Sequence, residues 1–307
     1  MSSLNHISKK QSLGRIISYL KSASYYIMKS RKLLVGTSIL LSLILIGVFE
    51  PLINSIRLGG LPSTAIGFYP RLLMPSLDFP LGTDHYGRDV LAMLITGIKN
   101  SLAVGFLVGF VSIAAALIVS LFAAYKGGAV DTFLNSFTNV ILILPSWAIA
   151  AAAVAYIQRL DITLIALIIA SFAWAGPARQ IRSQVLSLKA RPYIDLAKMV
   201  GERDYEIIFF EILPNILPYV IVGFSYAVIG GILAETGLRL IGLGAAEIMT
   251  LGLLIHIFMT SGLIIQGYYH FIVGPVISLI LIFVSLNLIN IGLDELFNPR
   301  LKKVTGE

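Results

Sequence analysis

Three residues with metal-binding side chains lie close together in the segment "GTDHYGRDV": Asp84, His85 and Asp89. Carboxylate oxygens and an imidazole nitrogen can together hold a divalent cation. The same residues also suit a helix start, in which Thr83 or Asp84 caps a helix formed by "HYGRDVLAMLITG". We favour the helix start and therefore predict no metal site.

Motifs for covalent catalysis or nucleotide hydrolysis are missing from the sequence. No lysine follows a glycine, which excludes the G-K-[ST] signature of a phosphate-binding loop. The chain has no cysteine and no H-E-x-x-H motif, and its four histidines are scattered. We therefore expect no catalytic residue and no enzymatic activity in this chain.

Long uncharged segments dominate the 307 residues, of which 13% are charged and 57% hydrophobic. A helix needs about 20 apolar residues to cross a hydrocarbon layer of about 30 Å. Six segments meet or approach this length: 33–49, 100–125, 132–158, 162–178, 212–234 and 271–292. The sequence thus predicts an all-α, multi-pass protein of the cell membrane with six transmembrane helices.

The distribution of basic residues decides between six and seven spans, because residues 248–293 are long enough for two. With six spans and a cytoplasmic N-terminus, most of the 23 basic residues lie inside, as the positive-inside rule requires. Seven spans would place "NPRLKK" outside. We therefore predict that both termini are cytoplasmic and that 248–267 is an apolar outer segment packed on the bundle, interrupted by its glycine and histidine residues.

The net charge of +7 would suggest a nucleic acid partner for a soluble protein. Here the basic excess follows the membrane topology, so we expect lipid and no nucleic acid.

Residues 1–32 have apolar residues at helical spacing among basic ones, typical of an amphipathic helix on anionic lipid; a plain basic flank is the alternative. The rest divides into 33–98 (first span and long outer loop), 99–293 (core) and 294–307 (cytoplasmic tail).

Ion-driven transporters usually keep charged groups near the middle of the membrane. The centres of the predicted spans hold none. Glu235 lies at the outer end of the fifth span, where it can form an interfacial salt bridge with Arg239 at i, i+4. An ion-coupled secondary transporter is therefore disfavoured, and a membrane scaffold without transport activity is a third alternative.

The third span carries four polar residues at i, i+3, i+4 and i+7: Thr132, Asn135, Ser136 and Asn139. This polar stripe is too costly to expose to lipid, so it faces either a neighbouring helix or a water-filled cavity. Pro145 and Ser146 interrupt the same span. Interhelical hydrogen bonding and a translocation path that includes Ser146 both remain open.

A highly charged segment, "RPYIDLAKMVGERDYEIIFFEILP" (191–214), separates two apolar spans. Its first part predicts a short amphipathic helix with an apolar face of Tyr193, Leu196, Ala197 and Val200. The opposite face carries i, i+4 pairs, Arg191 with Asp195 and Lys198 with Glu202. Gly201 ends this helix, and a second helix leads to Pro214, where the next span begins.

These residues resemble the EAA loop of ABC importer permeases, the cytoplasmic segment that docks on the ATPase subunit. The matching positions are Asp195-Leu196-Ala197, Gly201 and Leu213-Pro214. Three further segments resemble signatures of the dipeptide, oligopeptide and nickel class, in its C-type subunit: "FPLGTDHYGRDVLAMLITG" (79–97), "ILAETGLRLIGLG" (232–244) and "LDELFNPRLK" (293–302). The loop departs from the family in having Asp-Leu-Ala for Glu-Ala-Ala, and the tail has Asn298 where Asp is usual, so we expect a matched ATPase.

The resemblance implies the type I permease fold, with a coupling loop at 179–214. The coupling residues would be Tyr193, Asp195, Leu196, Ala197, Lys198, Gly201, Glu202, Leu213 and Pro214. At Ala197 and Gly201, we expect close approach to leave no room for a larger side chain.

The resemblance also implies the partners: a sibling permease in a heterodimer, two cytoplasmic ATPases that bind ATP and Mg, and an extracellular binding protein. This chain itself would hold no cofactor. It would form the pore of an ATP-driven importer for oligopeptides or similar small solutes, with an oligosaccharide or nickel as the alternative substrate.

Overall fold

The computed structural model describes residues 30–157 and 160–297, and its regular elements are helices. The predicted N-terminal amphipathic helix and the tail from Asn298 onward lie outside the described residues. The elements, in chain order, are α2 (Arg31–Val48), α3 (Glu50–Leu58), α4 (Val90–Lys126), α5 (Gly128–Ile143), α6 (Ser146–Tyr156), α7 (Ile162–Ala173), α8 (Ala175–Lys189), α9 (Pro192–Val200), α10 (Asp204–Glu206), the π-helical η1 (Ile207–Ile212), α11 (Leu213–Leu240), α12 (Leu251–Thr260) and α13 (His270–Phe297).

Four continuous helical stretches are long and apolar enough to cross a membrane: α2, α4, the run from α10 to α11, and α13. Two helix pairs are bent, α5 with α6 by 73° and α7 with α8 by 45°. Each bent pair, taken together as one broken span, is also long and apolar enough to cross a membrane. The described residues therefore contain up to six candidate spans, and the prediction of an all-α multi-pass protein is confirmed.

Several helices extend beyond the predicted spans. α4 has 37 residues, a length of about 55 Å, and begins ten residues before the predicted span. α8 continues the fourth span to Lys189, well into the segment predicted to be a cytoplasmic connector. Charged residues at helix ends hid these extensions from the sequence, because they interrupt the apolar runs without interrupting the helices.

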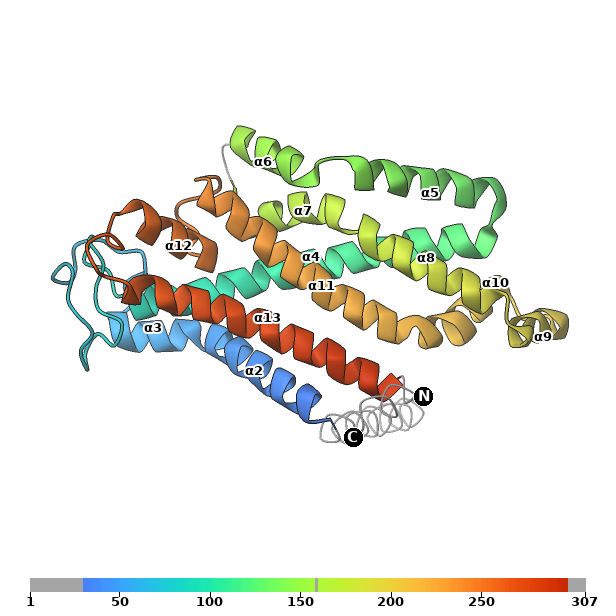
Figure 1. The fold of residues 1–307 in the computed structure, drawn as a ribbon, viewed down its shortest axis with the longest axis horizontal. Coiled ribbons are helices and arrows are strands. Elements are labelled where there is room, and N and C mark those ends of the chain that lie inside the picture. The colour runs from blue at the N-terminus through green and yellow to red at the C-terminus, as the bar shows by residue number, and fades with distance from the viewer. Residues whose placement is uncertain (1–29, 158–159, 298–307) are drawn as a thin grey trace, which may run out of the picture.

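Helices α4 and α11 cross closely at the centre of the bundle (Figure 1). Gly231 makes this contact possible, because a Cβ at that position would lie 2.7 Å from the Cβ of Val108. Gly105 has the same role opposite Ile232, at 2.6 Å. A methyl group at either position would push the two helices apart.

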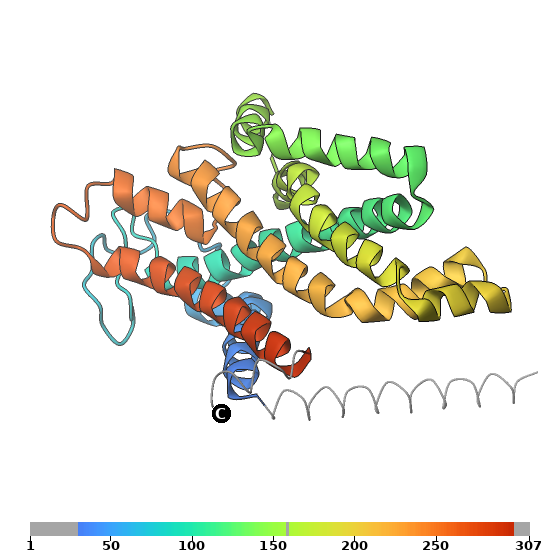
Figure 2. The same cartoon turned by 45° about the vertical axis from the view of Figure 1, so that its right-hand side comes forward.

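The bundle has two different ends (Figures 1 and 2). One end carries α9; the other, called the loop end here, carries residues 59–89 and 241–250. At the loop end, α12 packs on the bundle through residues such as Leu251, Leu254 and Phe258, which are fully buried. The prediction that 248–267 packs on the bundle is confirmed, but Gly252 and His256 lie within α12 instead of interrupting it.

A helix start was predicted in "GTDHYGRDV", with Thr83 or Asp84 as the cap. The helix start is present, but the predicted cap was wrong, because α4 begins at Val90 and is capped by Asp89. Asp89 accepts hydrogen bonds from the backbone N–H groups of Leu91 and Ala92. Asp84 instead forms a turn: it accepts from the backbone N–H of Arg88 and pairs with the Arg88 guanidinium at 2.6 Å.

Arginine side chains, and not a metal ion, are the charged partners of the two acidic groups. Asp89 also binds Arg57, at 2.6 Å. Burial lowers the pKa of the His85 imidazole, Asp84 opposes that shift, and Arg88 and Arg71 reinforce it. Among the described residues, no three His, Asp or Glu side chains are grouped to hold a metal ion.

The predicted salt bridge between Glu235 and Arg239 is present, with 2.8 Å between Glu235 Oε1 and Arg239 Nε. The two side chains are 1% and 2% exposed. Thr250 donates a hydrogen bond to Glu235 Oε1, and Arg239 donates to the carbonyl of Ala245. The pair thus fastens residues 241–250 to the end of α11.

Candidate functional site

Helix α9 is the short helix at the far end of the bundle from the loops (Figure 1). It begins with Pro192, whose fixed φ suits a first helical position. It ends at Gly201, whose φ of +91° is a left-handed conformation that favours glycine. The predicted short helix and its stop at Gly201 are confirmed.

The buried face of α9 differs from the predicted one. Ile194 and Ala197 are buried against the bundle. Leu196, Met199 and Val200 are 61%, 83% and 81% exposed. The prediction was wrong for Leu196 and Val200, because Ile194 supplies the inward apolar contact and turns them outward. These three side chains are called the exposed apolar face of α9.

The charged residues of α9 pair differently from the prediction. Lys198 lies 3.6 Å from Asp195, an i, i+3 contact between largely exposed side chains. Neither of the predicted i, i+4 pairs, Arg191 with Asp195 or Lys198 with Glu202, is among the ion pairs of the described residues. An exposed pair of this kind contributes at most about 1 kcal/mol to the free energy of folding.

The structure gives a reason for glycine at 201 within this chain, whereas the predicted close approach at the ATPase contact stays a prediction. A Cβ at Gly201 would have no atom of the described residues within 4 Å. The positive φ, not close approach, therefore explains the residue here. Ala197 is 8% exposed because it packs in an apolar cluster of this chain, and its predicted approach to the ATPase stays a prediction.

After Gly201, the predicted second helix is continuous with the fifth span. The π-helical η1 precedes α11, and the N–H of Leu213 donates to the carbonyl of Ile208, five residues back. Pro214 has no N–H to donate, which explains a wider turn at this place. Leu213 is half-buried and Pro214 is exposed.

Polar contacts attach the α9 end to the rest of the bundle. The Tyr125 hydroxyl at the end of α4 donates to Asp204 at 2.9 Å. Lys189 at the end of α8 donates to the carbonyls of Ala124 and Tyr125. These contacts hold the ends of α4 and α8 and the start of α10 together next to α9.

The predicted polar stripe lies on α5. Thr132 and Ser136 are exposed, whereas Asn135 and Asn139 are half-buried. Thr132 bonds the carbonyl of Gly128 in its own helix. Asn139 alone reaches another helix, accepting a hydrogen bond from Arg179 of α8 at 2.6 Å.

The third span is interrupted at Pro145 and Ser146, as predicted, and α6 departs from α5 by 73°. Ser146 is exposed and lines a small hollow between α6, α7 and α11. The structure therefore does not place Ser146 on the stripe. It lies beyond the bend, on the side toward the loop end.

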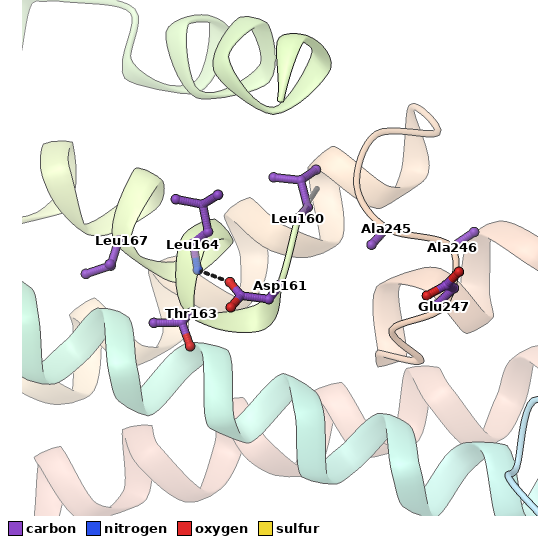
Figure 3. A pocket seen from close by; sticks show the side chains of 8 residues that line it. All are labelled: Leu160, Asp161, Thr163, Leu164, Leu167, Ala245, Ala246 and Glu247. Atoms are coloured by element: carbon purple, nitrogen blue, oxygen red, sulfur yellow. Dashed lines mark hydrogen bonds between the residues drawn. The ribbon is translucent and has the colours of Figure 1, made fainter. Parts of the chain in front are cut away.

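A larger hollow, of about 900 Å³, lies between the start of α7 and residues 245–247 (Figure 3). Asp161 caps α7 by accepting a hydrogen bond from the N–H of Leu164 at 2.7 Å. Thr163 and Glu247 add polar groups to a lining that is otherwise leucine and alanine. The hollow faces the loop end, away from α9.

The arrangement described so far is a helical membrane bundle with a separate amphipathic helix at one end. Residues 116–303 match the family described as the binding-protein-dependent transport system inner membrane component. The chain belongs to this family. As a member, it is a permease subunit of an ABC importer and not an enzyme, and its ATPase is a separate subunit.

Two relatives illustrate the similarity. The dipeptide transport system permease protein DppC of Alkalihalophilus pseudofirmus is 32% identical over 93% of this chain and 91% of its own length. The oligopeptide transport system permease protein OppC of Mycobacterium tuberculosis is 30% identical over 76% of this chain and 80% of its own length. The similarity therefore covers most of the permease, including all of α9.

Within this importer permease, sequence reasoning missed three residues of the candidate site. Ile194 lies on the buried face of α9 and Met199 on the exposed face. The i, i+3 spacing of Ile194 and Ala197 was the sequence pattern that could have identified the buried face. Arg179 was assigned to the cytoplasmic segment because it ends an uncharged run. No pattern in the sequence places it beside Asn139.

Proposed function

We propose that this permease and a sibling subunit form the pore of an ATP-driven importer for oligopeptides or similar small solutes. Membership of the importer family supports the transport role, and the dipeptide and oligopeptide transporters among the relatives support the substrate class. ATP and Mg would be bound by two cytoplasmic ATPases. An extracellular binding protein would deliver the substrate.

The exposed apolar face of α9 is the observation that carries the coupling role. Three neighbouring apolar side chains at the tip of the molecule have little contact with their own chain. Apolar side chains in water are stabilised by burial against a partner. We assign this face, with Gly201 and Glu202 beside it, to the contact with an ATPase.

Uptake of labelled peptide tests this function. The complex is isolated through a tag on this chain and reconstituted in vesicles with ATP on the ATPase side and the binding protein on the other. We expect ATP-dependent accumulation of peptide, and accumulation of an oligosaccharide or nickel instead would revise the substrate. A complex without ATPase subunits, or uptake driven by an ion gradient alone, would contradict the proposal.

The α9 end is assigned to the cytoplasm, with both chain termini on the same side. The chain has no cysteine, so single cysteines report on their own positions. We expect Leu77→Cys, at a fully exposed outer-loop position, to react with an impermeant thiol reagent in intact cells. We expect Met199→Cys to react only in inverted vesicles, and the reverse pattern would refute the assignment.

The polar stripe on α5 is assigned to the translocation path, with interhelical hydrogen bonding as the competing role. Within the described residues, Thr132, Asn135 and Ser136 form no hydrogen bond to another helix, and they are at least partly exposed, which favours a water-filled path. We expect Asn135→Cys and Ser136→Cys to react with a small hydrophilic thiol reagent in at least one nucleotide state.

Thr138, which lies next to the stripe on α5 but is buried, provides the matched control: Thr138→Cys is expected to stay unreactive. If neither stripe position reacts in any state, and Asn135→Ala lowers stability without changing transport per folded complex, the stripe serves helix packing. The path assignment would then be wrong.

A further inference from the structure

One charged side chain borders the polar stripe of α5 without a charged partner. Arg179 is exposed on α8 and donates from Nη2 to Asn139 Oδ1 at 2.6 Å. Among the described residues no carboxylate forms an ion pair with it, whereas Arg182, one turn further along α8, pairs with Asp131 at 2.5 Å. Arg179 is thus an uncompensated cation beside the proposed path.

The position of Arg179 along the bundle makes exposure to lipid costly. Lys189, which bonds the carbonyls at the end of α4, lies ten residues further along α8, about 15 Å away. Arg179 therefore lies well inside the bundle relative to its α9 end. Arg179 also directly follows the uncharged residues 162–178 of the fourth span, and a guanidinium there is expected to face a protein partner or water, because burial in hydrocarbon costs at least a few kcal/mol.

The hydrogen bond also fixes what the pair can bind. A guanidinium only donates, so the Asn139 atom facing it is the acceptor oxygen. The Asn139 Nδ2 group then points away as a donor, and no hydrogen bond from it is formed within the described residues. The remaining N–H groups of Arg179 and the Nδ2 group of Asn139 together offer several donors, and the acceptor of the pair, Asn139 Oδ1, already binds Arg179.

A site rich in donors, one of them cationic, suits an anion. Arginine binds carboxylates through two parallel hydrogen bonds, which gives both charge and shape selection. Every free-acid peptide carries a carboxylate at its C-terminus, and some carry another in a side chain. We propose that Arg179 and Asn139 form a carboxylate-binding position in the translocation path, an inference that rests on the peptide import proposed above.

The test uses the complete importer, isolated with its partners and reconstituted in vesicles, and two labelled peptides, Ala-Glu-Ala and Ala-Gln-Ala. We expect Arg179→Gln to lower import per assembled complex about tenfold, the effect of losing one charge-assisted hydrogen bond. ATPase stimulation by the loaded binding protein should stay unchanged. Arg179→Lys, which keeps the charge, should retain most of the import.

The two peptides distinguish the source of the carboxylate. An equal loss for both indicates the C-terminal carboxylate, and a loss confined to Ala-Glu-Ala indicates the side chain. Arg31→Gln is the matched control, because Arg31 is an exposed arginine at the start of α2, a helix that packs mainly on α13 and α4. Its import should equal that of the unmodified importer.

Three results would overturn the carboxylate site: normal import by Arg179→Gln, an equal loss in Arg179→Lys, or a loss only in the amount of assembled complex. The last would identify Arg179 as a structural contact between subunits. Failure of the unmodified importer to accumulate either peptide is a separate outcome. That result would reject the proposed substrate class and, with it, this site.

Discussion

The Met199→Glu substitution is expected to lower ATP-driven import at least about tenfold while the amount of permease in the membrane stays unchanged. Met199 is 83% exposed at the centre of the exposed apolar face of α9, so the chain itself loses little packing. A charge at the centre of an apolar interface must be desolvated when the partner docks. The measurement is import per complex, together with the amount of ATPase that co-purifies.

Ile265→Glu is the control for this experiment. Ile265 is 92% exposed, and the segment between α12 and α13 that contains it lies at the loop end (Figure 1), so the substitution adds the same charge at a similarly exposed apolar position far from α9. We expect the amount of bound ATPase to be unchanged in this variant. Normal ATPase binding and normal import by Met199→Glu would show that α9 does not carry the contact.

A substitution at Gly201 distinguishes, in the same import assay, between a role for its backbone conformation and close approach by the ATPase. Asparagine tolerates left-handed backbone conformations better than other side chains do. Gly201→Asn therefore keeps the turn after α9 while adding a side chain into open space. Retained import would show that only the backbone conformation matters, whereas lost import would indicate close approach by the ATPase.

The Glu235→Ala substitution is expected to destabilise the permease by about 3–5 kcal/mol. It leaves the Arg239 guanidinium, 2% exposed, without its carboxylate partner, and it also removes the acceptor for Thr250. The expected observation is a clear fall in the thermal unfolding temperature of the detergent-solubilised chain.

The paired control replaces both charges at once. Glu235→Leu combined with Arg239→Met leaves no buried charge, so it should recover much of the stability lost in the single variant. Recovery is expected to be incomplete, because Arg239 also holds residues 241–250 through the carbonyl of Ala245. If the single variant is as stable as the unmodified chain, the pair does not fasten this segment.

The sequence predicted the spans, the position of α9 and the salt bridge at the end of α11, because each depends on local patterns. Uncharged runs reveal spans, Gly201 ends a short amphipathic helix, and i, i+4 spacing brings Glu235 to Arg239. Family resemblance supplied the function, which these patterns alone did not establish.

The faces of α9 and the start of α4 could not be predicted, because they depend on contacts between distant segments. Ile194 is buried against residues of the bundle that sequence periodicity does not identify. Asp89 caps α4 instead of Asp84, because Asp84 is held in a turn by Arg88. The bond between Arg179 and Asn139 joins residues 40 positions apart, on separate helices.

The contact between α9 and an ATPase is tested most directly by a photo-reactive amino acid at position 199 of the assembled complex. Irradiation should yield a product containing this chain and the ATPase, and the same probe at position 265 should not. A product with the ATPase only from position 265, or none from positions 196, 199 and 200 in an active complex, would contradict the assignment of α9 as the ATPase contact.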